Sequence, residues 1–268
     1  MIGLKSRPAA PGRPPAAETV PARVARWGIL LLAGLALWQW LAVAVDSPVL
    51  PTVPAFRSAA AQVVVSDTFW NALGQTLLGW SMGLALAFLI GVPIGLLIGT
   101  FTILDHATRV SVDILRSLPL IVVTPILVLT YGTSLLTKVI LVFLATVAQM
   151  ILHAAYGVRE VDKVAKETAV SYHLTLPDRI RFLYVPSAAG FIGTGLRIAA
   201  TIALGVCIGV ELITSVPGLG LEILRSSANA RPGIAFVYFV AASVLGLVIA
   251  YVFQRVERTA LFWNPKFR

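Results

Sequence analysis

Long apolar runs separated by short polar segments occupy most of this chain. A helix needs about 20 apolar residues to cross the hydrocarbon core of a bilayer. Runs close to that length recur from residue 27 onward, although one of them is short and contains Pro119 and Pro125. The pattern predicts about six membrane-spanning helices, at 27–45, 73–101, 118–131, 135–156, 187–214 and 234–253.

The two ends of the chain differ from this pattern. Residues 1–26 are rich in proline, alanine and basic side chains and cannot build a core, so we predict a disordered basic tail. Residues 27–263 form the predicted membrane domain, and 264–268 form a second tail. The run at 27–45 exceeds the roughly 7 to 15 apolar residues of a signal peptide, so it is expected to stay as the first membrane helix; cleavage after Ala44 is the alternative.

One polar segment, residues 160–186, is long enough to fold by itself, and we call it the knob. Its first half predicts a short amphipathic helix, because apolar residues recur there at helical spacing: Val161, Val164, Ala165 and Ala169. Residues 173–177 should break this helix. Asp178 is placed to cap a second helix, which should end at Pro186 because proline disfavours helical geometry in the residue before it.

The composition also indicates a membrane protein. Hydrophobic residues make up 58% of the 268 positions and charged residues only 12%, which is too little charge for a soluble domain of this size. The net charge of +9 does not indicate nucleic-acid binding, because the 21 basic residues are scattered among loops and not gathered on one face. We therefore expect an all-α integral membrane protein whose main surroundings are the lipid bilayer.

Lysine and arginine are distributed unevenly among the predicted loops. If the amino terminus is inside, the cytoplasmic segments 1–26, 102–117, 157–186 and 254–268 hold 5, 2, 5 and 4 of them, or 16 in total. The outer loops then hold four, at Arg57, Lys138, Arg225 and Arg231. Because basic residues favour cytoplasmic loops, we predict that both termini and the knob are cytoplasmic.

The knob resembles the cytoplasmic EAA loop of permeases from binding-protein-dependent ABC importers. That loop reads Glu-Ala-Ala, three residues, Gly, nine residues, Ile, one residue, Leu-Pro. Here the same spacing holds Glu167-Thr168-Ala169, His173, Leu183, and Val185-Pro186. His173 stands where the family has a glycine in a left-handed turn, a geometry that histidine adopts more readily than most residues.

The resemblance extends over residues 48–263 and is to the nitrate, sulfonate and taurine branch of the family. It is carried by Asp113–Pro119, Thr124-Pro125, Lys138, Gly157–Arg159, Gly195–Arg197, Glu211 and Gly218–Gly220. It implies a permease subunit in the inner membrane of a bacterium, with about six spans and a coupling-helix loop. It also implies a second permease copy, ATP-binding subunits that hold the ATP and magnesium, an external solute-binding protein, and no cofactor in this chain.

The resemblance places the contact with the ATP-binding subunits on the knob. The residues expected to make that contact are Val164, Ala165, Glu167, Thr168, Ala169, His173, Leu183 and Pro186. The branch suggests a small anion or zwitterion as cargo, although heterocyclic vitamin precursors are also carried by it.

Polar residues inside the predicted spans are candidates for the transport route, because such residues usually face a cavity or a partner. Arg197 and Glu211 lie about 21 Å apart on one helix and cannot pair with each other. Glu211 is a candidate for the outer end of the route, with a structural hydrogen bond as the alternative, and Arg197 suits a structural role better. Gln149 is a third candidate and shares a face with His153, which we expect to be a packing residue.

Small residues recur at every fourth position of the second predicted span: Gly79, Gly83, Ala87, Gly91, Gly95 and Gly99. This spacing lets another helix approach closely, which drives association in lipid. The partner is either a helix of the same chain, which we favour, or one of a second copy.

No common catalytic motif is present in the sequence. There is no Walker A motif, no His-Glu-x-x-His, no Gly-x-Ser-x-Gly and no pair of cysteines, so neither an ATPase nor a catalytic or metal site is expected. Two alternatives to an ABC permease remain, a self-contained secondary transporter and a membrane scaffold that transports nothing. The first would usually show two halves that repeat each other, which this chain does not.

Overall fold

The computed structural model describes residues 20–45 and 50–260, except for the side chains of residues 20–25, 27 and 31. All of the regular structure in these residues is helical. In chain order the elements are α1 (Val20–Val45), α2 (Val53–Val65), α3 (Asp67–Thr100), α4 (Thr102–Ser117), α5 (Leu120–Tyr131), α6 (Leu135–Arg159), α7 (Lys163–Ser171), α8 (Leu176–Arg179), the π-helical turn η1 (Ile180–Tyr184), α9 (Val185–Thr214), α10 (Leu219–Ala228) and α11 (Pro232–Ala260).

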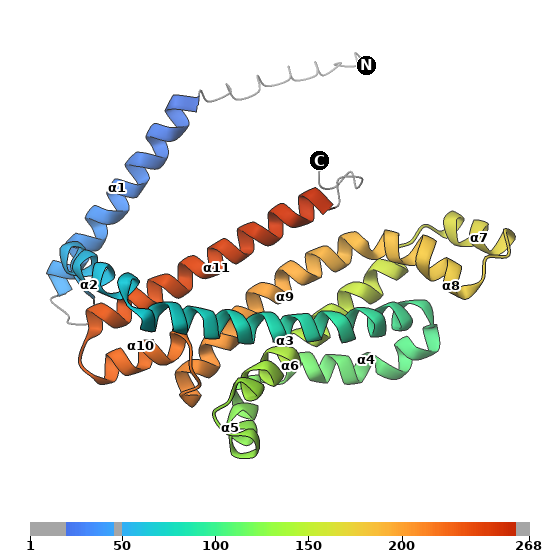
Figure 1. Ribbon diagram of the computed structural model, residues 1–268. Helices are drawn as coiled ribbons and strands as arrows, with labels where there is room; N and C mark the ends of the chain where they lie inside the picture. Colours follow the sequence, from blue (N-terminus) through green and yellow to red (C-terminus); the bar gives the residue numbers. More distant parts are fainter. Residues whose placement is uncertain (1–19, 46–49, 261–268) are drawn as a thin grey trace, which may run out of the picture.

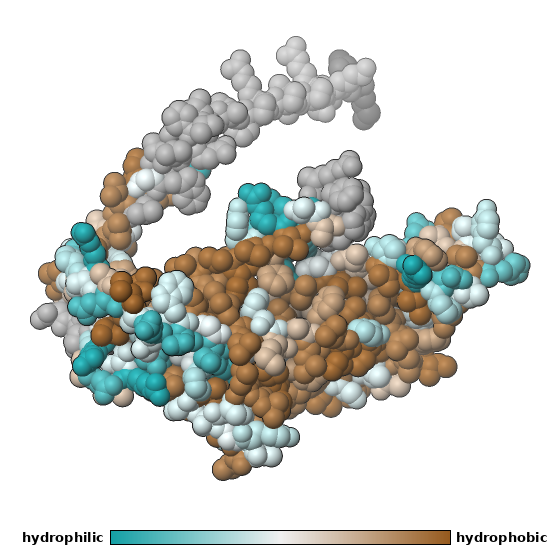
Figure 2. Space-filling view, viewed as in Figure 1, coloured by the Kyte–Doolittle hydropathy of each residue, from teal (hydrophilic) through white to brown (hydrophobic). Residues whose placement is uncertain are grey.

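Helices α3, α6 and α9 form the centre of the molecule, and α11 packs on α9 (Figure 1). Their contact faces are lined with small and branched apolar residues, among them Ala87, Val142 and Ala203, each fully buried. The outer faces keep large exposed hydrophobic side chains such as Leu89 and Leu247. Figure 2 shows these faces as a broad brown band between teal ends, which is the surface expected where helices face lipid.

The glycine stripe of α3 packs against α6 of the same chain. A β-carbon added to Gly83 would lie 2.6 Å from the Val142 side chain, and one added to Gly95 would lie 2.3 Å from the Ile151 carbonyl oxygen. Only glycine, which has no β-carbon, therefore fits at these two positions. The intramolecular interpretation of the stripe is confirmed, and the alternative of a subunit interface on this face is wrong.

Among the residues that the structure describes, five helices are long and apolar enough to cross a membrane, or six if α4 and α5 count as one broken span. Two predictions are wrong: residues 102–117 are a helix and not a loop, and the run at 118–131 is only the second half of a bent helix pair. Residues 102–117 are helical and pack along α3 and α6, and α5 turns away from α4 by 84°. The break has a local cause: Pro119 keeps the preceding Leu118 extended, at φ −64° and ψ 124°.

The two ends of the helical bundle carry different structures. At one end lie α2 and α10, and at the other the knob projects beyond the ends of α6 and α9 (Figure 1). Helix α1 begins at Val20, so the predicted tail at 1–26 is helical in its last residues. Residues 1–19 and the tail predicted at 264–268 lie outside the described residues.

Candidate functional site

The first half of the knob folds as predicted. Asp162 caps α7 by accepting a hydrogen bond from the Val164 amide at 2.6 Å. At the other end the His173 amide donates to the Val170 carbonyl and the Leu174 amide donates to the Ala169 carbonyl, at 2.9 and 3.0 Å. These two bonds define a Schellman motif, which needs a left-handed residue after the helix. His173 is that residue, with φ of 51°, so the predicted left-handed turn is confirmed.

The start of the second knob helix differs from the prediction. Thr175, not Asp178, is the N-cap of α8, and its hydroxyl accepts from the Asp178 amide at 3.4 Å. The helix starts earlier because Pro177 is tolerated in the first turn, where its missing N–H leaves no hydrogen bond unmade.

The predicted end at Pro186 is also wrong. Helix α8 continues through η1 into α9, and Pro186 lies in the first turn of α9. The chain accommodates the proline through a wide turn, in which the Val185 amide bonds to the Ile180 carbonyl five residues back. The knob therefore continues without a break into α9.

A groove on the knob brings together five of the eight residues expected to contact an ATP-binding subunit. Val164, Ala165, Thr168, Ala169 and Leu183 line it. Glu167, His173 and Pro186 are exposed but are not among the residues that line the groove. The four apolar residues of the predicted amphipathic helix do not form one exposed face, because Val161 and Ala169 are buried. The exposed apolar residues are instead Val164, Val170, Tyr172 and Phe182.

Glu211 lies in a closed cluster of polar groups with Lys138 and Thr76. We call these three residues the buried ion pair. Lys138 Nζ donates to Glu211 Oε1 at 2.6 Å, and both residues are at most 1% exposed. The lysine also donates to the carbonyls of Gln75 and Pro217, at 3.1 and 2.7 Å. Every donor of the ammonium group is thus used.

The carboxylate of Glu211 is equally saturated. It accepts from the Thr76 hydroxyl at 2.9 Å and from the Gly220 amide at 3.0 Å, while the Leu219 amide donates to Thr76 Oγ1 at 2.9 Å. The loop before α10 approaches so closely that a β-carbon on Gly218 would lie 2.0 Å from Glu211 Oε1. The buried ion pair therefore joins α3, α6, α9 and the start of α10.

Arg197 has a partner on another helix. Its Nε lies 3.4 Å from Glu257 Oε2 of α11, and Thr194 donates to the same carboxylate at 2.6 Å. An ion pair between α9 and α11 agrees with the structural role that the sequence favours for Arg197. Neither Arg197 nor Glu211 is among the residues that line the central cavity described next.

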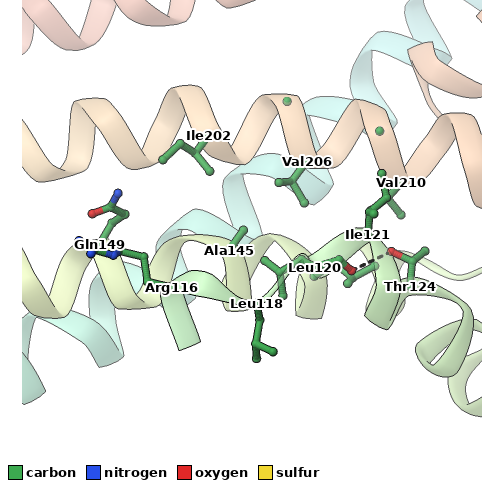
Figure 3. Close-up of a pocket in the computed structure, with 13 residues that line it drawn as sticks. Arg116, Leu118, Leu120, Ile121, Thr124, Ala145, Gln149, Ile202, Val206 and Val210 are labelled. Atoms are coloured by element: carbon green, nitrogen blue, oxygen red, sulfur yellow. Dashed lines mark hydrogen bonds between the residues drawn. The ribbon is translucent and has the colours of Figure 1, made fainter. Parts of the chain in front are cut away.

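The central cavity lies between α5, α6 and α9 and has a volume of about 370 Å³ (Figure 3). Of the three predicted route residues, Gln149 lines it. The His153 ring turns away, toward the Gln149 carbonyl at 2.8 Å, and it packs against Gly195 as expected for a packing residue. Within the described residues no group of three histidine, cysteine or acidic side chains could hold a metal ion.

Two basic residues of the site were misplaced by the sequence analysis. Lys138 is expected in an outer loop but is buried in α6, and its position as the fourth residue of the apolar run 135–156 is the signal that could have shown this. Arg116 was assigned to a cytoplasmic loop but lines the central cavity. Its signal is the proline three residues later, which marks a break inside a membrane segment.

The chain is similar to known transport proteins. The taurine transport system permease protein TauC of Escherichia coli (strain K12) is 23% identical over 206 residues, 77% of this chain and 75% of that protein. The putative aliphatic sulfonates transport permease protein SsuC of Bacillus subtilis (strain 168) is 26% identical over 247 residues, 90% and 88% of the two chains.

The fold has a counterpart among solved structures. A chain of the MetNI methionine ABC transporter in an inward-facing conformation superimposes with a TM-score of 0.61 at 17% identity, over 73% of this chain and 99% of that one. A family model described as binding-protein-dependent transport system inner membrane component matches residues 91–260, which include the knob, the buried ion pair from Lys138 onward and the central cavity. The chain therefore belongs to this family and is a permease subunit of an ABC importer.

Proposed function

We propose that the permease docks on a cytosolic ATP-binding subunit through its knob and moves a small sulfonate inward when that subunit hydrolyses ATP. Two copies of the chain would form the route, and an external binding protein would deliver the cargo. ATP and magnesium would be held by the partner subunits, with no cofactor in this chain. This orientation, with both termini and the knob in the cytoplasm of a bacterium, follows from the excess of basic residues in those segments.

The observation that carries the proposal is the apolar groove of the knob. Val164, which lines the groove, is 68% exposed, and Tyr172 and Phe182 are exposed too. All three lie outside the membrane helices, so lipid does not cover them. Exposed aromatic and branched residues around a groove are typical of an interface with another protein. Because α8, η1 and α9 are continuous, a force on the groove would reach α9 directly.

The proposed cargo rests on the names of the relatives. The two similar permeases are named for taurine and for aliphatic sulfonates, and each aligns over at least three quarters of its own length. A small sulfonate is therefore the first cargo to test.

The docking proposal can be tested by placing a charge in the groove. The assay is taurine-stimulated ATP hydrolysis by the reconstituted complex of permease, ATPase and binding protein. Val164→Asp should lower this rate about tenfold or more, because an unpaired carboxylate buried in an interface weakens binding by about 2 kcal/mol or more. Val170→Asp is the matched control, since Val170 is 53% exposed on the same helix but does not line the groove. Equal hydrolysis in the two variants would contradict docking through the groove.

A further inference from the structure

Two polar side chains on the wall of the central cavity have no partner among the residues that the structure describes. Arg116 and Gln149 lie at one end of the cavity in Figure 3, and Thr124 and Val210 lie at the other. Neither the guanidinium of Arg116 nor the side-chain amide of Gln149 makes a hydrogen bond or ion pair with any residue that the structure describes. Thr124, by contrast, donates to the Leu120 carbonyl of its own helix. The cavity therefore offers an unused cation and an unused amide.

Gln149 lies near the middle of α6, and Arg116 lies at the break between α4 and α5, where its side chain is exposed in the single chain. Gln149 is the fifteenth of the 25 residues of α6, so it is about 21 Å from one end of the helix and about 15 Å from the other. Arg116 is the last residue but one of α4, directly before the break that leads into α5. A charged group at this depth is costly and usually faces a route or a bound ion.

No carboxylate among the described residues lines the central cavity. The acidic residues of α4, Asp105 and Asp113, line a separate cavity together with Arg109 and Arg159. Asp105 pairs there with Arg159. The positive charge of Arg116 is therefore left uncompensated within the central cavity.

We propose that Arg116 and Gln149 bind the anionic group of the cargo at mid-depth on the translocation route. Arginine suits this task because its planar N–H donors can bind two oxygens of a sulfonate at once and its charge is permanent. The Gln149 amide can donate to a further oxygen. The cavity volume of about 370 Å³ leaves room for a small organic anion, and an added β-carbon on Gly205 or Gly209 of its wall would meet nothing within 4 Å.

This inference rests on the proposed function only in treating the cavity as part of the route, and it can be tested without cargo or ATP. The variant Gln149→Cys is treated separately with two methanethiosulfonate reagents that modify cysteine. One reagent carries an ethylsulfonate group and the other an ethyltrimethylammonium group. The measured quantity is the ratio of their rates in the full-length permease, in vesicles of phosphatidylcholine. The native Cys207 is fully buried and supplies the background.

We expect the sulfonate reagent to be favoured, and Arg116→Gln to lower the rate ratio about tenfold because the two reagents differ by two charges. Arg116→Lys should keep most of the preference. Arg109→Gln, which removes the same charge from the same helix outside the cavity, should leave the ratio unchanged. Val206→Cys on the opposite wall of the cavity gives the same comparison without altering Gln149.

Three results would overturn the proposal: an unchanged ratio in Arg116→Gln, an equal drop in Arg109→Gln, or no reaction of either cysteine. Free ethanesulfonate should slow the sulfonate reagent when Arg116 is present. If phosphatidylglycerol in the vesicles slows it and ethanesulfonate does not, the site binds a lipid headgroup and the assignment to cargo is wrong. Failed docking of the ATPase would leave these rates unaffected, so the two proposals can fail separately.

Discussion

Glu211 and Arg116 are both charged groups within the membrane helices, and their surroundings differ in every respect. Glu211 is fully buried and accepts from Lys138, Thr76 and the Gly220 amide. Arg116 lines a cavity and has no partner within the described residues. Where water is absent, a charge must be neutralised by the protein or by something that enters. The difference indicates which charge stabilises the fold and which is free to bind a solute.

Glycines show the same contrast. On α3 the stripe at every fourth residue is filled by α6, so that a β-carbon at Gly95 would collide with the Ile151 carbonyl. On α9, Gly205 and Gly209 are also four residues apart, but they border the central cavity and have open space before them. The same four-residue spacing of glycines therefore allows close packing on α3 and leaves room for the central cavity on α9.

The largest effect should come from breaking the buried ion pair. Glu211→Gln leaves the ammonium of Lys138 buried without a counter-charge, and removing one partner of such a pair costs about 3–5 kcal/mol. We expect a large fall in thermal stability of the purified permease in detergent, with transport per folded complex unchanged.

Glu222→Gln is the matched control for that change. Glu222 also pairs with a basic residue, Arg225, at 2.9 Å, but that arginine is 61% exposed. Pairs of this kind contribute about 0–1 kcal/mol. If the two variants lost equal stability, or if Glu211→Gln impaired transport by folded protein, the structural role of Glu211 would be refuted.

An intermediate effect is expected from filling the glycine contact between α3 and α6. Gly95→Ala should destabilise the permease by about 1–3 kcal/mol, because its methyl group would overlap backbone atoms that cannot move alone. Gly205→Ala makes the same chemical change on the cavity wall and should be neutral or slightly stabilising, since alanine favours the helix. Thermal unfolding of both variants checks this, and equal losses would contradict the assignment of the two stripes.

The smallest effect on stability should come from Arg116. Arg116→Gln removes a charge that no described residue compensates, so the free energy of unfolding should change by less than about 0.5 kcal/mol. The same thermal unfolding assay measures it. A loss as large as that of Glu211→Gln would mean that Arg116 supports the fold, and the contrast between the two charges would disappear.

Much of the architecture was predictable because it depends on local composition. The apolar runs at 73–101, 135–156, 187–214 and 234–253 correspond to α3, α6, α9 and α11, since only a helix satisfies its own backbone in lipid. The spacing of the EAA-like segment likewise located α7 and its left-handed turn at His173. The family assignment decides against a secondary transporter and against a scaffold.

Errors arose where a residue's role depends on distant parts of the chain. Pro186 reads as a stop because its effect on the preceding turn is local, yet the π-helical turn η1 carries the helix past it into α9. Lys138 and Arg116 both read as loop cations, because a window of sequence cannot show what a side chain will face.

The sequence by itself determined that this chain is a helical membrane protein with a knob of the EAA type, because hydropathy and motif spacing are properties of neighbouring residues. Only the tertiary structure decided that Lys138, 73 residues before Glu211 in the chain, neutralises it, while Arg116 and Gln149 are left to face a common cavity. The reason is physical: the cost of a charge in an apolar region depends on the few ångströms around it, and helix packing sets which groups occupy that space.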